Sequence, residues 1–178
     1  MRITISGPPG SGKTTACSKL SEKLGMEAIV FGKIFRELAA EKNLSLGELG
    51  AIAEKDPAID KMIDSRILEI AMARDDIILE SRLSAYMCSR HDIPALKIYI
   101  TASPEVRMSR IGVREGETLE EACAKTIDRQ KSEAKRYKMY YDIDIEDTSV
   151  YDLIINTDDL DPDQVVEEII KAMEARKC

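Results

Sequence analysis

The 178-residue chain has no tryptophan, one histidine (His91) and no apolar run long enough to cross a bilayer. Its N-terminus lacks the basic region, apolar core and cleavage site of a signal peptide. The cysteines stand far apart, without C-x-x-C or zinc-ligand spacing, and we expect free thiols at Cys17, Cys88, Cys123 and Cys178. These absences predict a cytoplasmic protein with neither a disulfide framework nor a zinc site.

The balance of charge is acidic, with a formal net charge of −7. Phosphate backbones require basic surfaces, so we expect neither a nucleic-acid partner nor a membrane partner. The charge is unevenly spread: residues 105–138 hold nine Lys or Arg against seven Asp or Glu, whereas residues 142–168 hold eleven acids and no Lys or Arg. A basic segment within an acidic chain indicates a confined site for an anionic ligand.

Short apolar runs alternate with amphipathic stretches along the whole chain. Strands are expected at 2–6, 28–31, 77–79, 96–100 and 153–155. Helices are expected at 13–24, from Gly32 to Asn43, and at 45–52, 57–74, 104–114, 119–141 and 162–173. This alternation predicts a single α/β domain, a three-layer fold with a five-stranded parallel sheet covered on both faces.

A glycine-rich segment follows the first expected strand and precedes the first expected helix. It fits the P-loop pattern G-x-x-x-x-G-K-[ST] in its strand–loop–helix context. Its backbone N–H groups would form a nest for phosphates, Lys13 would reach the outer two phosphates, and the Thr14 hydroxyl would coordinate Mg²⁺. The predicted nucleotide-binding residues are Gly7, Pro8, Pro9, Gly10, Ser11, Gly12, Lys13, Thr14 and Thr15.

A triphosphate site alone leaves several classes of protein open. A GTPase should carry N-K-x-D to read guanine, and the chain has none. A motor ATPase usually has a strand that ends in a pair of acids, whereas only Glu80 ends a strand here. A kinase that joins two polyanions needs several cations on separate segments.

Arginines occupy the places that such a kinase would require. Any one of them would by default be a solvated surface side chain. Arg82 follows the third strand at the carboxyl edge, where open α/β sheets bind ligands, and Arg suits phosphate because its planar fork pairs two oxygens at once. The set comprises Arg36, Arg82, the helical series Arg107, Arg110 and Arg114, and the i, i+4, i+7 series Arg129, Glu133 and Arg136.

Along essentially its whole length, the chain resembles the nucleoside monophosphate kinases and, among them, the archaeal type of cytidylate kinase. The strongest markers are Gly7–Thr15, Gly32–Arg36, Asp56–Asp60 with Arg66, Leu79–Leu83, Arg129–Tyr137 and Tyr151–Thr157. The resemblance implies ATP as phosphate donor, Mg²⁺ as cofactor and CMP, often with dCMP, as acceptor. It also implies a core (1–31, 75–106 and 137–178), a monophosphate-binding excursion (32–74) and a short lid (107–136), all in one domain. We expect a monomer.

The resemblance further implies roles for individual residues. Gly32, Arg36 and Arg82 would hold the acceptor's phosphate. Asp60, Asp64 and Arg66 would lie near the cytosine, where a carboxylate can accept a hydrogen bond from the N4 amino group. For the two aspartates, a position on a solvated helix face is an equal alternative. Arg107, Arg110 and Arg114 would belong to the lid, with Arg107 and Arg114 on the nucleotide. Lys13, Arg110, Arg129 and Arg136 would be catalytic, and Glu80 would join Thr14 in holding Mg²⁺, through a bound water.

Two features depart from the pattern of this group: Ser81 replaces a glycine after the strand acid, and Gln130 replaces an acid in the lid. Two alternatives for the function stay open. The first is a kinase for AMP, UMP or a small sugar or acid. The second is a P-loop ATPase whose hydrolysis drives a conformational switch.

Overall fold

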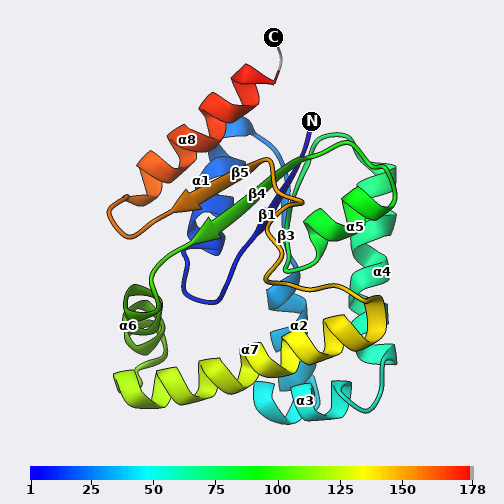
Figure 1. The fold of residues 1–178 in the computed structure, drawn as a ribbon, viewed down its shortest axis with the longest axis vertical. Helices are drawn as coiled ribbons and strands as arrows, with labels where there is room; N and C mark the ends of the chain where they lie inside the picture. Colours follow the sequence, from blue (N-terminus) through cyan, green and yellow to red (C-terminus); the bar gives the residue numbers. More distant parts are fainter. Residues whose placement is uncertain (177–178) are drawn as a thin grey trace.

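The computed structural model describes residues 1–176, so Cys178 and the last two positions of the predicted core lie outside the described residues. The strands are β1 (Arg2–Ser6), β2 (Ala28–Val30), β3 (Ile77–Glu80), β4 (Leu96–Thr101) and β5 (Leu153–Asn156). Within the described residues they form one five-stranded sheet in the order β2-β3-β1-β4-β5, with every neighbouring pair parallel. Each strand therefore directs its carboxyl end to the same edge (Figure 1).

Helices cover both faces of this sheet, which confirms the predicted α/β fold class. On one face, Ile3 and Ile5 of β1 pack with Leu20 of α1 (Lys13–Leu24) and Ile169 of α8 (Pro162–Ala175). On the other face, residues of β3 pack with α4 (Ala58–Ala73) and α5 (Ser84–Arg90). β3 contributes to both faces, with Ile78 in the first cluster and Ile77 and Leu79 in the second. A strand buried on both faces is the expected consequence of parallel crossovers.

Four further helices lie at the carboxyl edge of the sheet. They are α2 (Phe31–Glu41), α3 (Leu46–Ala53), α6 (Pro104–Glu115) and α7 (Leu119–Tyr141). The long helix α7 crosses the molecule beyond the ends of the strands, with α6 at its start and α3 packed beside it (Figure 1). Within segment 32–74, α4 packs on the sheet, and α2 packs on the same apolar cluster through Ile34 and Phe35. The part that stands away from the sheet is therefore α3 (Figure 1).

Two local features differ from the sequence-based expectations. Strand β2 ends at Val30, opposite the last residue of β3, and Phe31 begins α2 instead of ending the strand. Helix α5 was not predicted, because residues 84–88 are all buried and the segment shows no polar face. Among the described residues, no helix is long and apolar enough to cross a membrane.

Candidate active site

The glycine-rich loop joins β1 to α1 and packs closely against β4 and α6. Gly7 has φ +146°, and a Cβ there would lie 1.9 Å from the carbonyl oxygen of Ile100 in β4. Gly10 has φ +80°, and a Cβ there would lie 2.5 Å from the carbonyl oxygen of Arg107 in α6. Both positions therefore require glycine, because a side chain would drive β4 and α6 away from the loop.

Lys13 begins α1 and folds back over the loop, where its Nζ donates to the carbonyl oxygen of Pro8 at 2.7 Å. Burial, together with the nearby charge of Arg82, lowers the pKa of Lys13 to about 7, although Glu80 opposes this shift. A half-buried ammonium beside the backbone N–H groups of the loop is poised for a strong anionic partner. The site therefore fits the outer phosphates of a nucleotide.

The fit of a magnesium ion can be judged from Glu80 and Thr14. Glu80 at the end of β3 is buried, and its Oε2 has no hydrogen-bond partner in residues 1–176. Thr14, on the first turn of α1, is exposed at the loop. The described residues contain no group of three or more His, Cys, Asp or Glu that could hold a metal. The unpaired carboxylate oxygen of Glu80 and the Thr14 hydroxyl suit Mg²⁺, which binds one or two protein oxygens and completes its shell with water and nucleotide phosphates.

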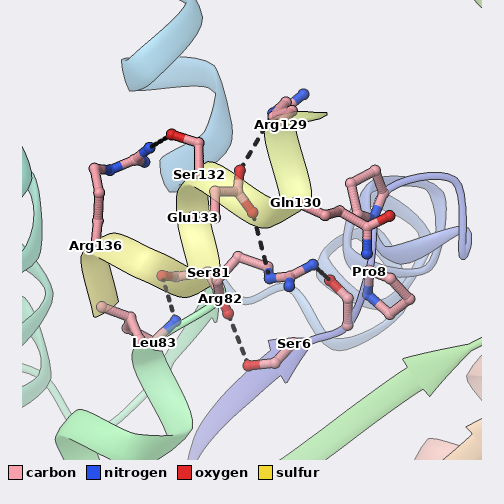
Figure 2. Close-up of polar contacts among 12 residues, drawn as sticks. Ser6, Pro8, Ser81, Arg82, Leu83, Arg129, Gln130, Ser132, Glu133 and Arg136 are labelled. Carbon is pink, nitrogen blue, oxygen red and sulfur yellow. Dashed lines mark hydrogen bonds and ion pairs between the residues drawn. The ribbon is translucent and has the colours of Figure 1, made fainter. Parts of the chain in front are cut away.

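A cluster of cations lies directly beyond the loop, around Glu133 of α7 (Figure 2). Arg129 Nε donates to Glu133 Oε1 at 3.2 Å, and Arg82 Nε lies 3.7 Å from Glu133 Oε2. Arg82 also donates from Nη1 to the carbonyl oxygen of Gly7 at 3.2 Å, so it bridges the loop and α7. The structure thus brings together Lys13, Arg82 and Arg129, which come from three separate segments.

Arg136 lies one turn after Glu133 on α7 and is almost fully buried. Its Nε donates to Asp60 Oδ2 at 2.7 Å, and its Nη1 donates to Ser132 Oγ at 2.7 Å. The guanidinium also lies 5.7 Å from the ring centre of Phe35, within the range of a cation–π contact. Asp64, one turn after Asp60 on α4, accepts a hydrogen bond from the Tyr141 hydroxyl at 2.8 Å. Both aspartates therefore face α7.

The three arginines of α6 have different surroundings. Arg107 Nη1 donates to the carbonyl oxygen of Pro9 at 3.2 Å and to Gln130 Oε1 at 3.4 Å. Arg110 donates to the Oγ1 and the carbonyl oxygen of Thr157, both at 2.9 Å, at the end of β5. Arg114 lines the cavity described below and pairs with Glu115 at 2.6 Å. Arg107 and Arg110 thus lie against the phosphate loop, and Arg114 does not.

Arg36 and Arg66 complete the arginines predicted for the acceptor. Arg36, on α2 beside Gly32, has no hydrogen bond or ion pair within residues 1–176. Loss of hydration, together with the nearby charges of Arg129 and Arg114, lowers the pKa of Arg36. Arg36 is therefore close enough to Arg129 for the two charges to repel. Arg66 is exposed on α4 and pairs with Glu69 at 2.9 Å, away from the cation cluster.

A cavity of about 550 Å³ extends from the phosphate loop between α3 and the helices α6 and α7. Its wall includes Pro9, Arg129, Glu133 and Arg136, which were singled out in the sequence, and a second group, Phe35, Gly50, Glu54 and Ser132, which lies around Arg136. The second group was missed by sequence reasoning. Phe35, directly before Arg36, was the one residue of this group that the sequence could have indicated. Gly50, Glu54 and Ser132 come together only when α3 packs against α7.

A strand–loop–helix phosphate site, faced by arginines from separate segments and opening into a cavity, defines a P-loop kinase. A model of the AAA domain family matches residues 6–128. The chain is 45% identical to the cytidylate kinase of Archaeoglobus fulgidus, over 99% of this chain and 97% of that one. It is 46% identical to the cytidylate kinase of Halobacterium salinarum, over 98% and 90% of the two chains. Shikimate kinase from Aquifex aeolicus shares the fold at 19% identity, with a TM-score of 0.60 over 99% and 98% of the chains.

This chain belongs to the cytidylate kinase family, and it is a phosphotransferase. The family predicted from the sequence motifs is therefore confirmed.

Proposed function

We propose that the chain transfers the terminal phosphoryl group of ATP to CMP, giving ADP and CDP, and that it also accepts dCMP. The observation that carries this proposal is the convergence of Lys13, Arg82 and Arg129 on one point between the phosphate loop and the cavity. Two polyanions repel each other, and fixed cations at their meeting point offset that repulsion and the charge that develops during transfer.

The donor would lie on the phosphate loop, from Gly7 to Thr15. Lys13 would leave the carbonyl of Pro8 and pair with the outer phosphates, and the exposed Thr14 hydroxyl with the free oxygen of Glu80 would hold Mg²⁺. When bound, this ion would neutralise charge on the phosphate oxygens. Arg107 and Arg110 already lie against the loop and would orient the nucleotide. Arg114 would join them only by leaving Glu115.

The acceptor's phosphate would lie between α2 and the end of β3. Arg36 has no competing partner, and Arg82 needs only to exchange Glu133 for a phosphate oxygen. Both guanidinium groups can hold two oxygens at once. Arg129 would then stabilise the charge on the phosphoryl group in transfer, and Arg136 would support it from two turns further along the same face of α7. No protein base is needed, because the attacking phosphate oxygen is already ionised.

The base would occupy the part of the cavity around Arg136. The ring of Phe35 offers an aromatic face, and Ser132 and Glu54 offer polar groups that could meet the cytosine edge. Asp60 and Asp64 do not line this cavity, and we propose that they act on the acceptor by holding Arg136 and α7 in place. Arg66 would reach the acceptor only by leaving its ion pair with Glu69.

Closure of two segments would exclude water, a competing acceptor, from the transfer. These segments are the part of 32–74 that stands away from the sheet and the lid region 107–136, which face each other across the cavity. The direct experiment is a coupled assay with MgATP and each of CMP, dCMP, UMP and AMP. Turnover of CMP above the others supports the proposal, and turnover of AMP or UMP without CMP contradicts the base assignment. ATP hydrolysis that is independent of every acceptor would favour a switch ATPase.

A further inference from the structure

Glu133 has an unusual position for a carboxylate in a site built for anions. It is 7% exposed, and four cations surround it: Arg82 and Arg129 in direct contact, with Lys13 and Arg136 close enough for their charges to act on it. Figure 2 shows its side chain between those of Arg129 and Arg82, pointing toward the phosphate loop. The carboxylate therefore sits where the phosphates of the substrates are expected to meet.

This carboxylate is an anion despite its burial. Burial alone would raise the pKa of Glu133, but the charges of Arg82, Arg129 and Arg136 outweigh burial, and the pKa is lowered. Its hydrogen bonding is also incomplete. Oε1 accepts from Arg129, whereas Oε2 is buried and accepts no hydrogen bond within the described residues. A structural ion pair in a core normally has its remaining lone pairs satisfied.

The surrounding charges show what Glu133 does in the unliganded chain. Arg136 has its own buried counter-ion in Asp60, but Arg82 and Arg129 have no carboxylate other than Glu133 among the ion pairs of residues 1–176. Bound substrates would bring several negative charges to the same arginines. Arg129 Nε cannot donate to Glu133 and to a phosphate oxygen at full strength, and the charge of Arg82 is shared in the same way, so the two anions compete.

We propose that Glu133 is the resident anion of the site, which holds Arg82 and Arg129 in the unliganded enzyme and is replaced by substrate phosphate. Phosphate binding is then an exchange of anions rather than a simple addition. A small anion gains little from this exchange, whereas a pair of phosphorylated substrates supplies enough charge to complete it. Glu133 is thereby a specificity residue that disfavours inorganic phosphate at the transfer point. This inference deepens the proposed function and rests on it for the identity of the displacing ligands.

The test is the thermal unfolding of the full chain with increasing inorganic pyrophosphate, in wild type, Glu133→Gln and Glu120→Gln. Glu120 is an exposed acid on the first turn of α7, so its substitution removes the same charge away from the cluster. We expect Glu133→Gln to unfold at lower temperature than wild type without pyrophosphate. We also expect its dissociation constant for pyrophosphate, obtained from the rise of the unfolding temperature with ligand concentration, to be about tenfold lower, because the internal competitor is gone.

A merely structural role for Glu133 would weaken anion binding on substitution, or leave it unchanged. An equal or higher dissociation constant for pyrophosphate in Glu133→Gln would therefore overturn the proposal. So would a variant that is unfolded and is not recovered by excess pyrophosphate. Glu133→Asp, which keeps the charge, should retain the weak pyrophosphate response of wild type. None of these readouts requires phosphoryl transfer, so failure of the proposed reaction with CMP would be seen separately.

Discussion

Arg136 of α7 donates from Nε to Asp60 Oδ2 of α4 at 2.7 Å, and the two side chains are 3% and 5% exposed. This buried ion pair joins the helix that carries the arginine cluster to a helix that packs on the sheet. Removing one partner of a buried pair leaves an uncompensated charge, which typically costs about 3–5 kcal/mol. The pair therefore determines where α7 lies above the phosphate loop.

The first prediction concerns this pair. Asp60→Ala should lower the free energy of unfolding, measured in urea, by about 3–5 kcal/mol, and should also lower the turnover of CMP. Asp75 pairs with Arg2 at the surface with its side chain 84% exposed, and it provides the control. Asp75→Ala should cost less than about 1 kcal/mol. Equal losses in the two variants would show that the Asp60–Arg136 pair does not fix α7.

Lys13 gives a prediction on the pH dependence of ATP binding. Its pKa is lowered to about 7 in the unliganded chain, and pairing with phosphates would favour the charged form. Binding above pH 7 must therefore take up a proton, and the affinity for ATP should fall by up to about tenfold per pH unit above that value. Calorimetric titration at constant Mg²⁺ from neutral to alkaline pH measures this slope.

Lys13→Arg is the matched control, because arginine stays charged throughout this range. Its ATP affinity should be independent of pH above 7, whatever its absolute value. If wild type shows the same flat profile, then Lys13 is already protonated in the unliganded chain and the prediction fails.

The third prediction assigns Arg36 to the acceptor. Arg36→Ala should raise the KM for CMP by about 30- to 150-fold, since a lost charged contact to phosphate is worth about 2–3 kcal/mol. Lys33, in the same helix, is exposed and pairs with Glu37, so Lys33→Ala should leave that KM within about twofold. Steady-state kinetics at saturating ATP compare the two variants. An unchanged KM in Arg36→Ala would remove Arg36 from the acceptor site.

Asp64 predicts how stability varies with pH. Burial first, and then the charge of Asp60, raise the pKa of Asp64 from 3.8 to about 7. The folded state therefore keeps a proton that the unfolded state releases, and the resulting stability is full below about pH 4 and is lost as the pH rises to 7. In this window wild type should lose about 1.4 kcal/mol per pH unit relative to Asp64→Asn. Urea unfolding at a series of pH values measures both slopes.

Asp159→Asn, at an exposed position before α8, should keep the slope of wild type. Parallel curves for wild type and Asp64→Asn would mean that Asp64 is ionised in the folded chain at acidic pH.

Much of the fold could be predicted because it depends on local patterns. The phosphate loop is a contiguous motif, and each of the five strands is a short apolar run with turn or cap residues at its ends. Helix α5 escaped prediction because it is buried on all sides, and such a segment has no periodic pattern to read.

The candidate site could be predicted only in part, for a related reason. Arg82 and Arg129 were identified by their place in the chain, and the spacing of Arg129 and Glu133 was visible there, but the contact of Arg82 with the same Glu133 is a property of the packed structure. The contact between Arg136 and Asp60 spans 76 positions along the chain, and no local pattern encodes it. The residues that line the cavity on α3 were missed for the same reason.

In the proposed reaction, Arg129 and its neighbouring cations stabilise the phosphoryl group during transfer. The most direct test of this role is the kcat for CMP, at saturating ATP and CMP, in Arg129→Ala and in Lys131→Ala, an exposed position of α7. We expect kcat to fall by about 10²- to 10³-fold in Arg129→Ala, because a donor to the charge of the transition state is lost. In Lys131→Ala, kcat should stay near the wild-type value. A kcat in Arg129→Ala within about twofold of wild type would contradict this role.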